Sequence, residues 1–269
     1  MHFPKSLAVI PVPALIVIIA ILVITLPYRP LVVFEPPLLG LTLSILFRFG
    51  MSMVVAYFSG RSYLASGSNS LLLLGSGVLA FGASGLAGSA FGLLIAGPNV
   101  LATVNNAGAL LASIPHAASA VLVFSGAPSQ KVPSYDRLKL NLIIAYLGVL
   151  VFTILLTTTS LQGAIPPFFI QGVGPTLLNN GVTGTAMALF AISALLFMRV
   201  HSKSKSEILY WYSLALALIA VSMSAFFLSP APGSAVAWSG RSATCLGGVY
   251  FLISVLTAGR GTRTEGIQS

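Results

Sequence analysis

Hydrophobic residues fill the chain in long blocks, which short polar or proline- and glycine-containing segments separate. Eight blocks have about the 20 residues that a membrane-spanning helix needs. Their approximate limits are Leu7–Pro27, Leu38–Phe58, Leu71–Ala96, Val100–Phe124, Leu140–Ser160, Val182–Met198, Ile208–Leu228 and Ala243–Ala258. The pattern predicts an all-α, polytopic transmembrane bundle of about eight helices. Residues 1–260 would form one transmembrane domain, and residues 261–269 a short polar cytoplasmic tail.

The composition supports a protein that lies almost wholly within the membrane. Of the 269 residues, 57% are hydrophobic and only 6% are charged, whereas a soluble domain has roughly 25% charged residues. We therefore expect a multi-pass protein of the cell membrane with no separate soluble domain. The net charge of +9 is spread over short loops and forms no basic face, which argues against nucleic-acid binding.

The placement of the basic residues predicts the orientation of the bundle. With the N-terminus inside, ten of the 13 Lys and Arg residues fall in cytoplasmic segments, two fall outside, and Arg48 lies within the second block. The ten are Lys5, Arg61, Lys131, Arg137, Lys139, Arg199, Lys203, Lys205, Arg260 and Arg263, and the two outside are Arg29 and Arg241. This asymmetry follows the positive-inside rule and predicts that both termini are cytoplasmic.

Arg48 is the one charged residue between Leu38 and Phe58. A guanidinium group stays charged in proteins, and in the middle of a membrane span it costs from about 2.5 to above 10 kcal/mol. Three interpretations stay open. The side chain reaches the interface or backbone carbonyls, it contacts an anion or polar ligand inside the bundle, or it forms a salt bridge with Glu35.

The fourth block carries polar side chains that are candidates for ligand contacts. These are Asn105, Asn106 and His116, and His116 follows a proline that bends the helix. A buried histidine here would form an interhelical hydrogen bond, sense a ligand or proton, or bind a metal or haem. With one cysteine, Cys245, and no HxxxH or HExxH spacing, the sequence predicts no metal site and leaves any cofactor unknown.

The connection from Leu161 to Asn180 is long and uncharged, with three prolines and three glycines. It would form a lid that re-enters the membrane under protein cover, or an interfacial loop anchored by Phe168 and Phe169. Gln171 and Thr176 in this connection are further candidate ligand contacts.

Glycines and aromatic residues give candidate packing and anchoring positions. The third block has small residues at which helices approach closely, namely Gly85, Gly88 and Gly92. Trp211, Trp238 and Arg241 stand near predicted helix ends and are expected to act as interfacial anchors. Trp238 and Arg241 are close enough in sequence to form a cation–π pair or to cap carbonyl groups.

Catalysis is not indicated by the acidic residues. All four acids, Glu35, Asp136, Glu207 and Glu265, lie in loops or near helix ends, and the chain has no paired carboxylates, P-loop or nucleophile elbow. We therefore predict that the chain is not an enzyme. The lack of acids at mid-depth also argues against a coupled transporter.

Five short strings together resemble a known family. They are RSYLASG at 61–67 running into LLLLGSG at 71–77, the segment 99–116, PPFFIQGVGPT at 166–176, YWYSLALAL at 210–218, and WSGR at 238–241 followed by LGGVY at 246–250. Over roughly residues 35–260, this pattern resembles the multi-pass N-terminal membrane sensor region (MASE-like) of archaeal and bacterial PAS-containing sensor histidine kinases.

The resemblance implies a sensor of a small ligand or of the membrane state that signals through its C-terminal helices. After Ala258 the sequence holds no PAS or kinase module, which fits a sensor cut from a longer protein or a stand-alone relative. The ligand would enter from outside near Phe168–Thr176. The alternatives are a structural or accessory subunit of a larger membrane complex and a small-molecule channel or transporter. Expected partners are the lipid bilayer, a cytoplasmic signalling protein, other membrane subunits or a second copy of the chain.

Overall fold

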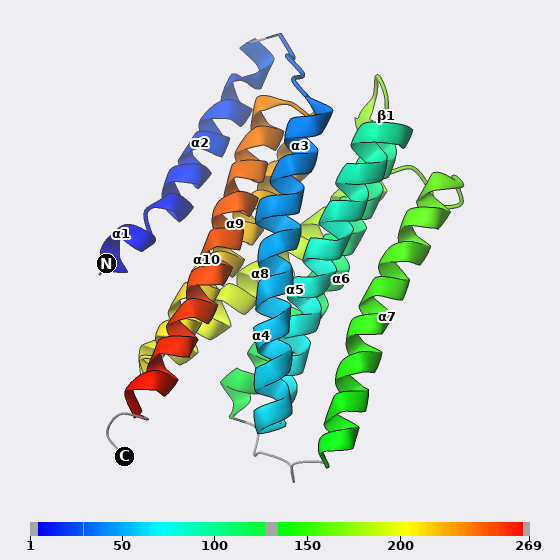
Figure 1. The fold of residues 1–269 in the computed structure, drawn as a ribbon. Coiled ribbons are helices and arrows are strands. Elements are labelled where there is room, and N and C mark those ends of the chain that lie inside the picture. The colour runs from blue at the N-terminus through cyan, green and yellow to red at the C-terminus, as the bar shows by residue number, and fades with distance from the viewer. Residues whose placement is uncertain (1–4, 29, 127–133, 266–269) are drawn as a thin grey trace.

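The computed structural model describes residues 5–28, 30–126 and 134–265, and the chain is folded almost entirely as helices (Figure 1). Seven helical segments of the described residues are long and apolar enough to cross a membrane. They are Pro11–Tyr28, Pro37–Ser66, Asn69–Ala96, Pro98–Ser125, Tyr135–Leu161, Leu177–Ser204 and Glu207–Leu228. The last expected span lies within a further long helix, Ala235–Glu265. The predicted all-α transmembrane bundle and its location in a membrane are confirmed.

Several of these segments are built from more than one element. The first joins α2 (Pro11–Thr25) to the 3-10 turn η1 (Leu26–Tyr28), and the short helix α1 (Lys5–Ala8) precedes it. The second joins α3 (Pro37–Leu43), the π-helical segment η2 (Ser44–Gly50) and α4 (Met51–Ser66). The third joins α5 (Asn69–Phe91) to the π-helical segment η3 (Gly92–Ala96). The others are α6 (Pro98–Ser125), α7 (Tyr135–Leu161), α8 (Leu177–Ser204), α9 (Glu207–Leu228) and α10 (Ala235–Glu265).

Most helices extend beyond the apolar blocks that predict them. Backbone hydrogen bonds continue through polar residues at a membrane surface, so α4 ends only at Gly67, which has a positive φ of 68° and caps the helix. Similarly, α10 begins at Ala235 and continues to Glu265, past the predicted boundary after residue 260. Residues 266–269 of the expected tail lie outside the described residues.

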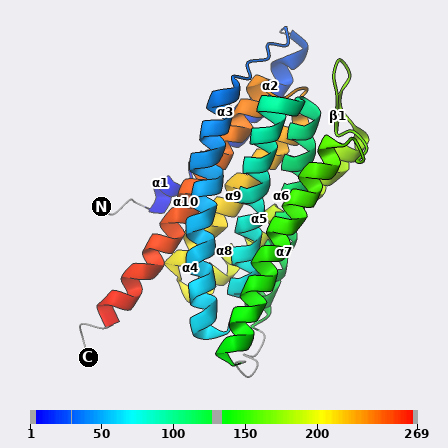
Figure 2. The same ribbon diagram turned by 45° about the vertical axis from the view of Figure 1, so that its right-hand side comes forward.

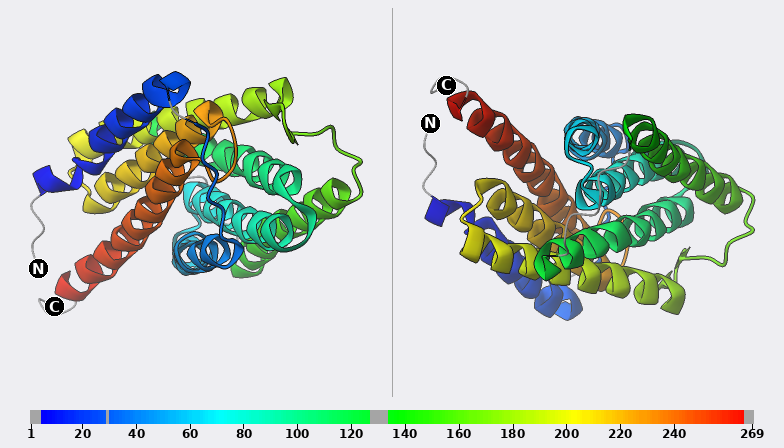
Figure 3. Two further views of the ribbon diagram at one scale, coloured as in Figure 1. Left: turned by 90° about the horizontal axis from the view of Figure 1, so that it is seen from above. Right: turned by 90° about the horizontal axis from the view of Figure 1, so that it is seen from below.

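The bundle has a buried centre and two peripheral helices. The spans of α5 and α9 are the most buried inside the protein, and those of α2 and α7 are among the least buried. Viewed along the bundle, α2 and α7 lie at its outer edges (Figure 3). Small residues bring α5 close to α6. A side chain on Gly108 of α6, for example, would overlap Ser84 of α5.

Consecutive spans run in opposite directions, so their loops gather at two ends (Figure 1). One end, the basic end, has six described basic residues at or near the helix ends, which are Arg61, Arg137, Lys139, Arg199, Lys203 and Lys205. The opposite end has the ion pair between Arg241 and Glu35. Arg29 and Lys131 lie outside the described residues. By the positive-inside rule, we infer that the basic end faces the cytoplasm.

The connection between α7 and α8 contains a small hairpin at the opposite end. Strands β1 (Phe169–Ile170) and β2 (Gly174–Pro175) pair antiparallel, with Phe169 opposite Pro175. The turn uses Gly172, whose φ of 84° suits glycine. The Oδ1 atom of Asn99 accepts hydrogen bonds from the backbone N–H groups of Phe168 and Phe169, at 2.9 and 3.1 Å. The connection is thus tied to the start of α6.

Candidate functional site

An inner cavity lies among η2, α5, α6 and the beginning of α10, and an adjoining outer cavity lies among η3, the start of α6, the hairpin and the segments before α3 and α10. The inner cavity has a volume of about 100 Å³ and is lined by Arg48, Asn105, Asn106, Arg241 and Cys245, among others. The outer cavity, of about 380 Å³, is lined by Glu35, Gln171 and neighbouring residues. Five residues, Leu93, Leu101, Phe169, Ala231 and Pro232, line both cavities, so the two cavities adjoin.

Arg48 projects from the π-helical segment η2 (Ser44–Gly50) into the inner cavity. Its Nε donates to the backbone oxygen of Phe81 at 3.1 Å, and its Nη1 donates to Oδ1 of Asn105 at 2.8 Å. The guanidinium carbon lies 4.2 Å from the centre of the Phe81 ring. Because π-helical turns redirect side chains and occur often at functional sites, the local backbone supports a site at this position.

These contacts separate the three interpretations of Arg48. The side chain is only 8% exposed, so it does not reach lipid, and it does contact a backbone carbonyl. The salt bridge with Glu35 is absent, because Glu35 pairs instead with Arg241 at 2.5 Å. The Nη2 atom of Arg48 is buried and has no hydrogen-bond partner among the described residues. A donor therefore remains available for a ligand.

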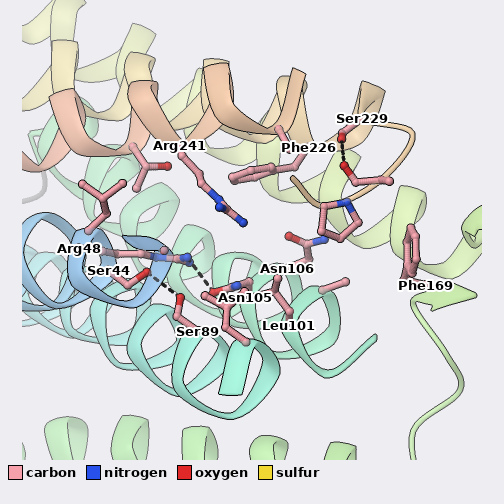
Figure 4. A pocket seen from close by; sticks show the side chains of 18 of the residues that line it. Ser44, Arg48, Ser89, Leu101, Asn105, Asn106, Phe169, Phe226, Ser229 and Arg241 are labelled. Atoms are coloured by element: carbon pink, nitrogen blue, oxygen red, sulfur yellow. Dashed lines mark hydrogen bonds between the residues drawn. The ribbon is translucent and has the colours of Figure 1, made fainter. Parts of the chain in front are cut away.

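Arg241 enters the inner cavity from α10, so two guanidinium groups point into one space (Figure 4). The Arg241 guanidinium lies 4.7 Å from the centre of the Trp238 ring, and Trp238 Nε1 donates to the backbone oxygen of Phe34 at 2.7 Å. Phe34 N–H in turn donates to the backbone oxygen of Gly233 at 2.9 Å. The segment before α3 is thereby fastened to the start of α10, with Trp238 and Arg241 in structural contacts at the opposite end.

Asn105 and Asn106 extend the polar lining of the inner cavity along α6. Asn105 accepts from Arg48, and Asn106 Nδ2 donates to Oδ1 of Asn179 on α8 at 2.7 Å. Ser44 of η2 and Ser89 of α5 share a hydrogen bond of 2.6 Å. Sequence reasoning did not select Ser44, Ser89, Asn179 or Cys245, since serines and asparagines at membrane-helix interfaces give no pattern that identifies a cavity.

The predicted packing glycines lie directly against this site. A side chain on Gly85 would overlap the Arg48 guanidinium, and one on Gly88 would press against the Asn105 amide. At Gly92 a side chain would meet the backbone of Leu101. The three positions therefore provide the space in which the polar side chains of η2 and α6 meet.

Three predicted ligand contacts lie apart from Arg48. His116 lines neither cavity; it is 1% exposed, and its Nδ1 lies 2.7 Å from the backbone oxygen of Ala112 in its own helix. Thr176 lines neither cavity, and its hydroxyl caps α8 by accepting from Asn179 N–H at 3.3 Å. Gln171 is exposed and lines the outer cavity only.

Two of the predicted interfacial anchors, Trp211 and Phe168, lie buried inside the protein. Trp211 is 8% exposed and packs edge-on against Tyr250, with ring centres 5.4 Å apart. Phe168 is 3% exposed and lies inside the protein, whereas Phe169 is half-buried and lines both cavities. The physical reason is that an aromatic residue at a helix end packs equally well in a core or at a lipid interface, and sequence does not distinguish them.

Metal binding has no support in the described part of the chain. No group of three or more His, Cys, Asp or Glu residues lies close enough to hold a metal ion within residues 5–28, 30–126 and 134–265. The side chains that line the cavities offer guanidinium, carboxylate, amide, hydroxyl and thiol groups beside apolar walls.

Comparison with known proteins identifies the family. Searches of curated proteins and of solved structures found no match. A family model described as a membrane-associated sensor domain, MASE3, matches residues 38–259. The match includes all of η2, α5, α6 and both arginines of the inner cavity, and it confirms the resemblance found in the sequence. The chain therefore belongs to the MASE3 family of membrane-associated sensor domains.

Proposed function

We propose that this membrane sensor module binds a small ligand in the inner cavity and transmits the binding event through α10. The observation that carries the proposal is Arg48, a guanidinium group that is 8% exposed, faces a cavity, and retains a buried donor without a partner among the described residues. Polar groups inside membrane spans are costly and commonly mark functional sites. A ligand that accepts this hydrogen bond would bind with a gain in free energy.

The outer cavity supplies the route of entry. It adjoins the inner cavity at the hairpin end of the bundle, and its lining includes Gln171 and Gly172 from the turn. This end is opposite the basic end, so the positive-inside rule makes it the outside. A ligand from outside would pass the hairpin and then reach Arg48.

The output follows from the path of α10. Its first turns contribute Arg241, Thr244 and Cys245 to the inner cavity. Farther along, a side chain on Gly248 would overlap the backbone oxygen of Phe47, so α10 touches η2 directly. The helix then leaves the bundle at an angle toward the basic end (Figure 2). A ligand that contacts η2 and α10 together would shift the packing between them.

A distance measurement across the basic end tests this transmission. Spin labels on Leu256→Cys in α10 and Ser62→Cys in α4 would report their separation in a Cys245→Ser background. Ala102→Phe fills the inner cavity from α6, away from both labels, and serves as a surrogate for an occupant. The matched control is Ala107→Phe, since Ala107 lies on α6 but lines neither cavity.

We expect Ala102→Phe to change the distance distribution between the labels and Ala107→Phe to leave it unchanged. The measurement is pulsed electron resonance on the full chain in lipid nanodiscs. Identical distributions for both variants and the parent would contradict transmission through α10, provided the variants remain monodisperse.

A further inference from the structure

The charges that line the two cavities do not cancel. Among the described residues, the charged side chains in the linings are Arg48 and Arg241 in the inner cavity and Glu35 in the outer one. Two positive charges and one negative charge leave a surplus of one positive charge. Because buried charges in proteins are usually paired, the surplus indicates a ligand with one negative charge.

Two guanidinium nitrogens without partners among the described residues are available as donors to a carboxylate. Glu35 Oε1 engages Arg241 Nη2, and the Nη1 atom of Arg241 is buried without a partner among the described residues. The same holds for Nη2 of Arg48, and both guanidinium groups point into the inner cavity (Figure 4). Guanidinium groups bind planar carboxylates with directed, charge-assisted hydrogen bonds.

The other residues that line the inner cavity indicate the chemistry of the rest of the ligand. Leu43, Phe47, Leu93, Leu101 and Phe226 supply apolar walls beside the two arginines. An uncharged hydrophobic body would fill this space without leaving polar groups unpaired, and it would extend toward the outer cavity of about 380 Å³. A second negative charge would exceed the positive surplus, which disfavours dianions.

We propose that the two cavities bind a monocarboxylate with an apolar body, its carboxylate group between Arg48 and Arg241. This inference rests on the proposed function of the inner cavity and names the chemical class of its ligand. A water-soluble aromatic or aliphatic acid and a fatty acid from the bilayer share this chemistry, and the experiment separates the two sources.

The single cysteine of the chain provides the readout. Cys245 lines the inner cavity, so its modification rate by methyl methanethiosulfonate reports whether the cavity is occupied. The wild-type chain in lipid nanodiscs is tested with benzoate, with benzyl alcohol of the same shape but no charge, and with the dianion phthalate. In a separate arm, oleate is added to the bilayer, with oleyl alcohol as its uncharged match.

We expect saturable protection of Cys245 by benzoate, by oleate or by both, and little protection by either alcohol or by phthalate. Arg48→Gln should weaken the protective acid about tenfold to a hundredfold, the loss typical of one charge-assisted hydrogen bond. Protection by oleate alone would assign a membrane fatty acid, and protection by benzoate would assign a soluble acid. The wild-type comparison of acid with alcohol needs no variant to fold.

Four outcomes would overturn the inference. They are equal protection by the alcohols, equal protection by phthalate, protection that survives Arg48→Gln, and no protection by either acid. Equal protection by the alcohols would still leave the cavity as a ligand site, so the proposed sensor function would stand. Conversely, strong protection by benzoate without any effect of cavity filling on the α10 labels would reject transmission and leave the carboxylate site intact.

Discussion

Replacing Arg48 by methionine separates a structural role of the guanidinium from a ligand-binding role. The substitution removes two hydrogen bonds, one to the Phe81 carbonyl at 3.1 Å and one to Asn105 at 2.8 Å. Bonds from a charged group contribute about 1.5–3 kcal/mol each, so the loss is about 3–6 kcal/mol. The substitution also removes the cost of burying a charged guanidinium, which is on the order of several kcal/mol. The two terms nearly cancel.

We therefore expect Arg48→Met to change the free energy of unfolding by about 1 kcal/mol or less, since a flexible thioether side chain of similar length fills the space. The assay is unfolding by sodium dodecyl sulfate in mixed micelles, followed by the combined fluorescence of Trp238 and of Trp211, which lies buried in α9. The same variant should lose the protection of the cysteine thiol by acids. Arg48→Lys is the control that keeps the charge.

The reasoning is refuted if Arg48→Met loses more than about 3 kcal/mol of stability and Arg48→Lys restores it, the size expected when a buried pair is broken. That result would give Arg48 a structural role, in which its hydrogen bonds hold η2, α5 and α6 together. A buried charge that adds nothing to stability, by contrast, is the usual mark of a site maintained for function.

Three further substitutions test the geometry around the cavities. Gly85→Ala places a methyl group into the guanidinium it faces and should cost about 1–3 kcal/mol in the detergent unfolding assay, whereas Gly148→Ala, which meets nothing within 4 Å, should be neutral or stabilising. Asn99→Ala removes the acceptor for two backbone N–H groups of the hairpin; hydrogen exchange measured by mass spectrometry should rise at the start of β1, and unchanged exchange would show that the hairpin holds without α6. Glu35→Gln removes the acid that pairs with Arg241 and so raises the net positive charge of the cavity linings. Benzoate should then protect the cysteine thiol at lower concentration than in the wild type. Weaker protection would show that the ion pair holds Arg241 in place for the ligand.

The sequence predicts the membrane spans well and their facing poorly. Apolar blocks reveal spans because a helix in lipid must be apolar for about 20 residues. In a membrane bundle, however, both the lipid side and the protein side are apolar, so no periodicity tells them apart. For this reason the sequence favours an interfacial position for Trp211 and Phe168, although both pack inside the protein.

The sequence reveals only part of the candidate site, because only some of its residues leave a local pattern. Arg48 is visible in the sequence because its charge is costly, and Asn105 is visible as a polar residue within an apolar block. The pairing of Arg241 with Glu35, 206 positions apart, depends on the packing of α10 and leaves no local pattern. His116 and Thr176 have polar groups that their own helices or loops satisfy, which sequence alone does not show. The subunit and channel hypotheses stay predictions.

The direction of Arg48 depends on the number of residues in the span Pro37–Ser66, because this span contains a π-helical segment. A π-helical turn is equivalent to one residue inserted into a regular α-helix, and each residue of an α-helix turns it by about 100°. Deleting one residue within Ser44–Gly50 would therefore restore a regular helix with α3 and α4 in nearly the same relative orientation, whereas deleting one residue from α3 or α4 would rotate part of the span by about that angle. Lipid-facing positions of this span should tolerate many substitutions. A single insertion or deletion in α3 or α4 should not be tolerated, because it would rotate the buried guanidinium relative to the rest of the span.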